Sequence, residues 1–163
     1  MPLNGYIFLL PKEIKLLIGV FVIVLSIGFF SGLLFVGETS SANPNGIEEQ
    51  YLGNEHDEDA EVMKFKKSEK EMLSLVHSHV LSMSVIFFLL ALIVSITKLN
   101  RQLKTFLMVE PLLSVVLTFG GLYFLWAGIL WMKYIVMFSG TLMTLSFLLS
   151  VVIILKQLFE KSP

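Results

Sequence analysis

The sequence predicts an all-α integral membrane protein, a four-helix bundle with one acidic loop outside the membrane. Of its 163 residues, 55% are hydrophobic and only 15% are charged, whereas soluble domains carry about 25% charged residues. Four stretches contain no Asp, Glu, Lys or Arg, namely 16–36, 72–97, 112–131 and 134–155. Each approaches or exceeds the roughly 20 residues that cross a hydrocarbon core. Residues 1–163 are therefore expected to form a single membrane domain in contact with the lipid bilayer.

The first span is expected at 16–36, after a short lead in which Pro11 marks a helix start. A cleavable signal peptide is the alternative, because Ser40-Ser41-Ala42 offers small residues to a peptidase. The apolar run is longer than the 7–15 residues of a typical signal peptide. We therefore expect the first span to be retained.

Residues 37–71 are expected to form an extracytoplasmic loop. Asn43-Pro44-Asn45-Gly46 is typical of a turn. His56 follows in the acidic run Glu55-His56-Asp57-Glu58-Asp59, whose imidazole and carboxylates are possible ligands of a divalent cation. The run lacks the spacing of an EF-hand loop. A solvated acidic loop is the favoured interpretation, and the identity of any metal is unknown.

Capping residues predict where the next two helices begin and end. Ser68 and Glu71 are spaced as a capping box, so the second helix should begin before its apolar run. Asn100 is expected to end this helix. Glu110-Pro111 is expected to open the third helix, with Pro111 in the first turn and Glu110 as an N-terminal cap rather than a proton carrier.

The third and fourth spans are separate helices. Residues 112–155 would extend about 66 Å as one helix, about twice the thickness of a hydrocarbon core. The chain is therefore expected to turn near Met132-Lys133-Tyr134. Trp126, Trp131 and Tyr134 surround this turn, as expected of an interfacial aromatic belt.

Basic residues near the span ends predict the orientation. The side that includes both termini has seven of them, against five on the other side. Because basic residues are enriched on the cytoplasmic side, both termini are expected in the cytoplasm of a bacterium, with the protein in its inner membrane. The seven are Lys12, Lys15, Lys98, Arg101, Lys104, Lys156 and Lys161, and the five are Lys64, Lys66, Lys67, Lys70 and Lys133.

Composition and motifs argue against several function classes. The chain has no cysteine and a net charge of −1, which excludes Cys-ligated metal centres and makes nucleic-acid binding unexpected. It has no GxSxG, HExxH or Walker motif, so hydrolase, protease and nucleotide chemistry lack support. We expect no enzyme activity from this chain on its own. Small residues along the spans favour close helix contacts, within the chain, with other subunits or in a homo-oligomer.

Two histidines lie inside the second apolar stretch. His77 and His79 follow Met72 by five and seven residues. Ionisable groups inside a membrane are costly, so they are candidates for function. Two residues on a helix correspond to about 200° of rotation. The two side chains therefore point to opposite faces and are not expected to chelate one metal ion together.

One of these two histidines is a possible ligand of a b-type haem between apolar helices. The second axial ligand would be Met137, the same histidine of a second copy, or none in a high-spin iron. The alternative interpretation is a pair of interfacial histidines bonded to backbone, serines or water. A proton relay, a quinone contact and a metal site completed by a partner also stay open.

Residues 51–83 resemble small bacterial four-span membrane proteins with a His-x-His at the start of the second span. The resemblance rests on Tyr51-Leu52-Gly53-Asn54, Phe65-Lys66-Lys67-Ser68, Glu71-Met72-Leu73, His77-Ser78-His79 and Met83. It covers about a fifth of the chain and implies no particular activity.

The stretch 79–88 is also similar to the low-spin haem-ligand helix of haem-copper oxidase catalytic subunits. Here Ser84 and Val85 separate Met83 from Ile86-Phe87-Phe88, whereas in that family the apolar triplet follows the methionine directly. The small number of spans and histidines excludes an oxidase catalytic subunit. We expect a small subunit of a bacterial membrane complex, either a b-type haem electron-transfer subunit or a non-catalytic scaffold or assembly protein.

Overall fold

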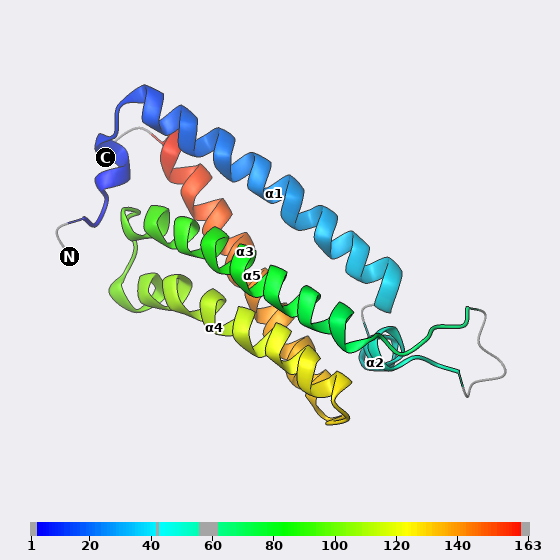
Figure 1. Ribbon diagram of the computed structural model, residues 1–163. Helices are drawn as coiled ribbons and strands as arrows, with labels where there is room; N and C mark the ends of the chain where they lie inside the picture. The colour runs from blue at the N-terminus through cyan, green and yellow to red at the C-terminus, as the bar shows by residue number, and fades with distance from the viewer. Residues whose placement is uncertain (1–2, 42, 56–61, 161–163) are drawn as a thin grey trace.

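The computed structural model describes residues 3–41, 43–55 and 62–160. These residues form a helical bundle with an extension at one end (Figure 1). Four helices, α1, α3, α4 and α5, are long and apolar enough to cross a membrane. The elements are the 3-10 helix η1 (Tyr6–Leu9) and the helices α1 (Lys12–Ser40), α2 (Pro44–Leu52), α3 (Glu69–Ser95), α4 (Arg101–Trp126) and α5 (Met132–Phe159). The predicted all-α membrane bundle is confirmed.

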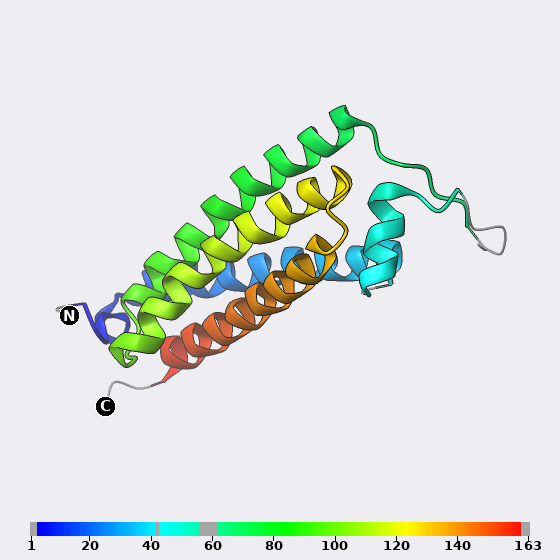
Figure 2. The same ribbon diagram turned by 90° about the horizontal axis from the view of Figure 1, so that it is seen from below.

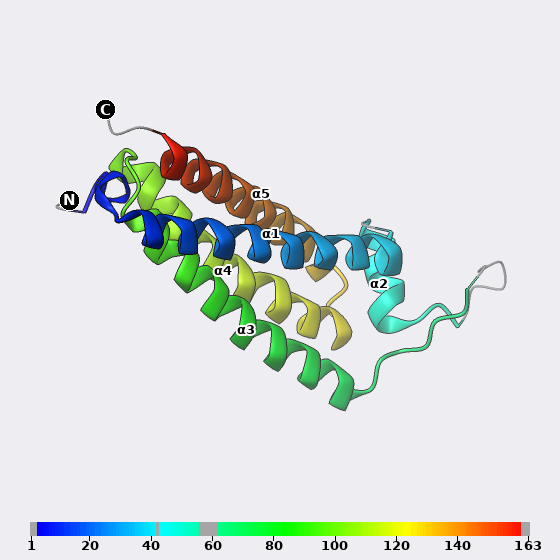
Figure 3. The ribbon, with the colours of Figure 1, turned by 90° about the horizontal axis from the view of Figure 1, so that it is seen from above.

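Helix α4 packs along α3 on one side and along α5 on the other (Figure 2). Helix α1 lies over the bundle beside α5 (Figure 3). Large side chains connect α1 to the other spans. Phe29 of α1 stacks on Phe147 of α5 with 4.0 Å between ring centroids, and meets Phe87 of α3 edge-on at 6.4 Å.

The N-terminal segment, the α3–α4 turn and the end of α5 lie together at one end of the bundle (Figure 1). The backbone N–H of Gly5 donates to the carbonyl of Thr97 at 3.2 Å. The backbone N–H of Lys98 donates to Oε1 of Gln157 at 2.7 Å. The basic residues of the α3–α4 turn are therefore on the same side as both ends of the described chain.

Lys104 is buried at this end, with 1% of its surface exposed. Its ammonium donates to Oδ1 of Asn4 at 2.7 Å and to the carbonyls of Ser95 at 2.9 Å and Thr97 at 2.6 Å. Three acceptors compensate for its lost hydration, and two of them are carbonyls at the end of α3 that have no helical partner. The lysine thus joins the N-terminal segment to the α3–α4 turn.

The third span begins ten residues earlier than the sequence indicated. Asn100 accepts from the backbone N–H of Leu103 at 2.9 Å and caps the start of α4. Asn100 therefore does not end the second helix, since α3 already ends at Ser95. Pro111 lies inside α4, so the prediction that Glu110-Pro111 opens the helix was wrong. Proline removes one helical hydrogen bond, and membrane helices tolerate this where neighbouring elements compensate.

The other predicted boundaries have mixed outcomes. The capping box is confirmed, since Ser68 accepts from the N–H of Glu71 and Glu71 accepts from the N–H of Ser68. The expected turn at 43–46 is instead the start of α2, where Asn43 caps the N–H of Gly46 at 2.8 Å. Asn and Pro favour helix starts as well as turns, which explains the error. The α4–α5 turn lies at 127–131, slightly before the expected position.

The segment outside the spans folds back onto the end of the bundle. The indole N–H of Trp126 donates to the carbonyl of Lys67 at 2.7 Å. Lys133 forms an ion pair with Glu48 of α2 at 2.6 Å. Tyr51 of α2 packs against the buried residues at this end, and burial raises the pKa of its hydroxyl. Helix α2 is therefore attached to the start of α5 and is not a free loop.

Candidate functional site

Glu110 is a buried carboxyl in the middle of α4. It lies nine positions after Arg101, which corresponds to about 13 Å of helix. Only 7% of its surface is exposed. The Ser114 hydroxyl donates to its Oε1 at 2.5 Å, whereas its Oε2 has no hydrogen-bond partner in the part of the chain that the structure describes. A polar oxygen without a partner at this depth is costly, so this position is a candidate for function.

Glu110 belongs to a polar seam between α4 and α5. Thr118 of α4 and Ser139 of α5 share a hydrogen bond of 2.8 Å, which fixes the register of the two antiparallel helices. From this pair, Glu110 lies eight residues along α4 and Ser146 lies seven residues along α5, toward the same end. The two residues are therefore level, at 1.5 Å per residue. The buried hydroxyls of Ser146 and Ser150 also have no partner within the described residues.

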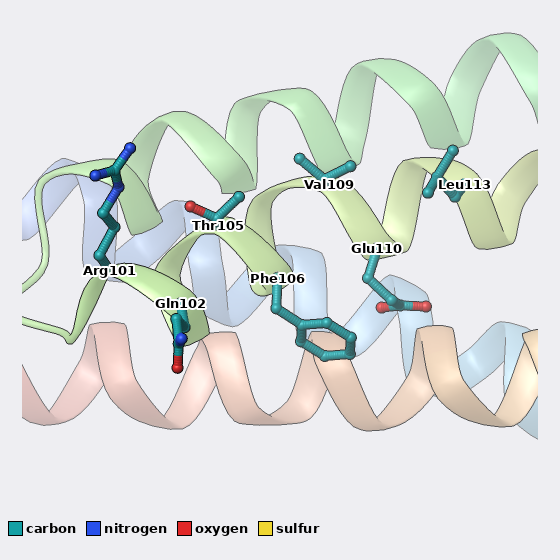
Figure 4. Close-up of a pocket in the computed structure, with 7 residues that line it drawn as sticks. All are labelled: Arg101, Gln102, Thr105, Phe106, Val109, Glu110 and Leu113. Carbon is teal, nitrogen blue, oxygen red and sulfur yellow. The ribbon is translucent and has the colours of Figure 1, made fainter.

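A shallow groove of about 790 Å³, open to the outside, runs along one face of α4 beside this seam, and all of its lining residues belong to this helix (Figure 4). Arg101, Gln102 and Thr105 line its end near the α3–α4 turn. Deeper residues are Phe106, Val109, Glu110 and Leu113. In Figure 4 the side chains of Gln102, Phe106 and Glu110 point toward α5. Within this seam the Glu110 carboxyl can accept a further hydrogen bond or attract a positive charge.

Sequence reasoning did not select Glu110, because it treated the residue as the cap of a helix that begins at Pro111. The available signal was Asn100, a residue that favours helix N-caps. A cap at this position starts the helix before Glu110. With Asn100 as the cap, Glu110 is in the third turn of α4. A capping role then no longer explains why a carboxyl lies at this position.

Both candidate histidines lie on exposed positions of α3. Nδ1 of His79 lies 2.9 Å from the carbonyl oxygen of Leu75, one turn earlier in the helix. The His79 ring packs on Phe119 of α4, with 4.7 Å between ring centroids. His79 therefore lies at the edge of the α3–α4 contact, and its Nε2 is on the opposite side of the ring from the bonded Nδ1.

Met137 lies on α5, which packs mainly against α4 rather than α3. It contacts the apolar cluster formed by Ile47, Met72, Leu122, Leu125 and Val136. No hydrogen bond or ring contact within the described residues joins Met137 to His77 or His79. Haem ligation by any of these three residues stays a prediction.

The other metal hypothesis concerns His56. Residues 56–61, which hold most of the acidic run, lie outside the described residues. In the ranges that are described, no group of three or more His, Cys, Asp or Glu side chains is arranged to hold a metal ion. The expectation of a solvated acidic loop therefore also stays a prediction.

A family model for a transmembrane helical domain, Aq_1264_TM, matches residues 41–163. The chain belongs to the Aq_1264_TM family. The matched part covers α2 to α5, so the Aq_1264_TM domain contains the α4–α5 seam, Glu110 and both histidines, whereas α1 precedes it. This agrees with the expected small multi-pass membrane protein. Searches of curated proteins and of solved structures gave no significant match.

Proposed function

We propose that the protein is a small non-catalytic subunit of a bacterial membrane complex, and that the second half of α1 contacts another membrane chain. The observation that supports this role is the exposure of α1. Every residue from 30 to 38 is exposed, around the full circumference of the helix. A span in a bundle usually buries one face against its neighbours. Residues 30–38 bury no face against the other described residues.

The residues of this half suit a helix partner. Gly28 and Gly32 are four residues apart and therefore lie on one face. A Cβ atom added at either position would meet nothing within 4 Å. Small residues at this spacing let two membrane helices approach closely. The proposed contact is a transmembrane helix of another subunit, or α1 of a second copy.

The test is the size of the particle that contains the protein after gentle extraction from native membranes. Wild-type protein is expected in a species larger than a single chain, and Gly32→Leu is expected to release it. Gly120→Leu is the matched control, since Gly120 is also a glycine of a span with open space around it. A wild-type monomer, or equal behaviour of the two variants, would contradict the proposal.

We also propose that both termini face the cytoplasm and that the protein lies in the inner membrane. The support is the gathering of Lys98, Arg101 and Lys104 at the end where the described chain begins and ends. Because the chain has no cysteine, single cysteines report the topology directly. Asn45→Cys should react with a membrane-impermeant thiol reagent in intact cells, and Gln102→Cys should not. The reverse labelling would invert the topology.

Electron transfer through a b-type haem is a second candidate function, and the geometry of His79 favours it. Histidine ligands of metals usually bond one ring nitrogen to a carbonyl, which orients the other toward the metal. His79 has this bond between Nδ1 and the carbonyl of Leu75. Since His79 is on an exposed position, the haem would lie at the outer edge of α3 and α4. A second ligand from another copy suits that position better than Met137 does.

A pyridine haemochrome spectrum of the purified protein tests this candidate. Wild-type protein expressed with sufficient haem should show a Soret band that His79→Ala abolishes and His77→Ala retains. Met137→Ala should leave the band unshifted if the second ligand comes from another copy. A colourless wild-type protein, or equal spectra of the two histidine variants, would remove haem from consideration and leave the non-catalytic role.

A further inference from the structure

Glu110 has no cationic partner among the residues that the structure describes. The nearest basic residues along α4 are Arg101 and Lys104, toward the membrane surface. The Lys104 ammonium is already bonded to Asn4 and to the carbonyls of Ser95 and Thr97. The only ion pair among the described residues joins Lys133 to Glu48, at the opposite end. None of these cations is therefore placed to pair with Glu110, and another molecule is the remaining source of a positive charge.

The groove restricts which molecule can supply this charge. Away from the membrane surface its lining is apolar, formed by Phe106, Val109 and Leu113 on the same helix as Glu110. Val109 and Leu113 are 47% and 60% exposed, so the groove opens sideways toward the lipid. Glu110 lies about 13 Å of helix below Arg101, whereas the charged groups of lipids stay at the membrane surface. A lipid headgroup therefore does not reach the carboxyl.

We propose that this groove binds a lipophilic organic cation, with the charged centre beside Glu110 and the apolar body against Phe106, Val109 and Leu113. The ligand enters from the bilayer, in which such cations dissolve. Its charge attracts the ionised Glu110 carboxyl from the groove side, since Oε2 itself has almost no exposed surface and Oε1 accepts from the Ser114 hydroxyl. The face of the Phe106 ring also attracts the cation through a cation–π interaction. This inference does not depend on the subunit role proposed above.

The experiment measures equilibrium binding of tetraphenylphosphonium to the full-length protein in detergent micelles. Tetraphenylborate has the same shape and the opposite charge, so it reports apolar partition alone. Wild-type protein should bind the phosphonium in excess of empty micelles and should not bind the borate in this way. Glu110→Gln should weaken phosphonium binding by about 10-fold to 100-fold, as expected for the loss of a contact with a charged group.

Two further variants keep the test decisive. Glu13→Gln removes a carboxyl from the first turn of α1 and should leave phosphonium affinity unchanged. Leu113→Trp narrows the groove without removing a polar group, and should also weaken binding if Glu110→Gln fails to fold. The proposal fails if wild-type protein binds no phosphonium above empty micelles, if Glu110→Gln binds it as tightly as wild type, or if the borate binds equally well.

Discussion

Alanine at Gly120 and alanine at the adjacent Gly121 of α4 should change the free energy of unfolding in opposite directions. A Cβ at Gly121 would lie 2.9 Å from Cγ2 of Val136 on α5, whereas a Cβ at Gly120 would meet nothing within 4 Å. Carbon atoms pack best at about 3.5–4.0 Å. Alanine at position 121 therefore pushes the two helices apart by about 0.6–1.1 Å. Valine is stiff about its Cα–Cβ bond, so Val136 cannot rotate away cheaply.

The expected magnitudes follow from this clash. Overpacking a well-packed contact costs about 1–3 kcal/mol. Glycine to alanine in a helix gains up to about 1 kcal/mol at both positions. Because this gain cancels in the comparison, Gly121→Ala should be less stable than Gly120→Ala by about 1–3 kcal/mol. The free energy of unfolding is measured by SDS titration in mixed micelles, followed by circular dichroism.

A double variant identifies the cause. If the clash with Val136 is responsible, Gly121→Ala combined with Val136→Ala should lose less free energy of unfolding than the sum of the two single changes. The close approach of α4 and α5 would be refuted by equal stabilities of the Gly120 and Gly121 variants. Additivity of the double variant within about 0.5 kcal/mol would refute it as well.

Three further predictions concern the two ends of the bundle. Lys104→Met should lower the free energy of unfolding by about 1–3 kcal/mol, because it removes the buried donor shared by Asn4, Ser95 and Thr97. The exposed Lys98→Met should be nearly neutral in the same titration. Trp126→Phe loses its bond to the carbonyl of Lys67, so it should cost about 1 kcal/mol and speed amide hydrogen exchange at 62–68, and unchanged exchange would contradict this role of the indole. A double-mutant cycle of Glu48→Gln with Lys133→Met should give a weak coupling that decreases at high salt, since ion pairs in contact with water are screened. A strong salt-independent coupling would contradict the partial exposure of this pair.

The sequence predicted the four spans because an uncharged stretch of about 20 residues has few alternatives to a membrane helix. It misplaced the start of α4 because Arg101, Lys104 and Glu110 made residues 101–111 look like a loop. The Lys104 ammonium is instead accommodated by oxygens of Asn4, Ser95 and Thr97, all of which lie outside α4. A local pattern in the sequence does not reveal these acceptors. Pro111 added a second misleading signal, since a proline inside a helix is costly in water but less so among packed membrane helices.

The candidate site was harder to predict than the fold. The opposite directions of His77 and His79 follow from helix geometry alone, whereas the choice of His79 came from the resemblance of residues 79–88 to a haem-ligand helix. The burial of Glu110 depends on the register of α4 against α5, which the Thr118–Ser139 pair fixes and no local pattern reveals. The partner of the His79 ring, Phe119, lies 40 residues away in the sequence. Such contacts become visible only when the helices are placed together.

The two proposed surfaces lie on different spans, so their functions should be separable. Helix α4 is the most buried span and holds the groove and Glu110, whereas α1 is the least buried and packs beside α5. Gly32→Leu should therefore change the size of the native particle and leave phosphonium affinity within about twofold of wild type, since distant sites act additively. Glu110→Gln should weaken phosphonium binding and leave the size of the native particle unchanged. If either variant changes both properties, the groove is coupled to the α1 contact, and cation binding would be a signal from the subunit to its complex rather than an independent activity.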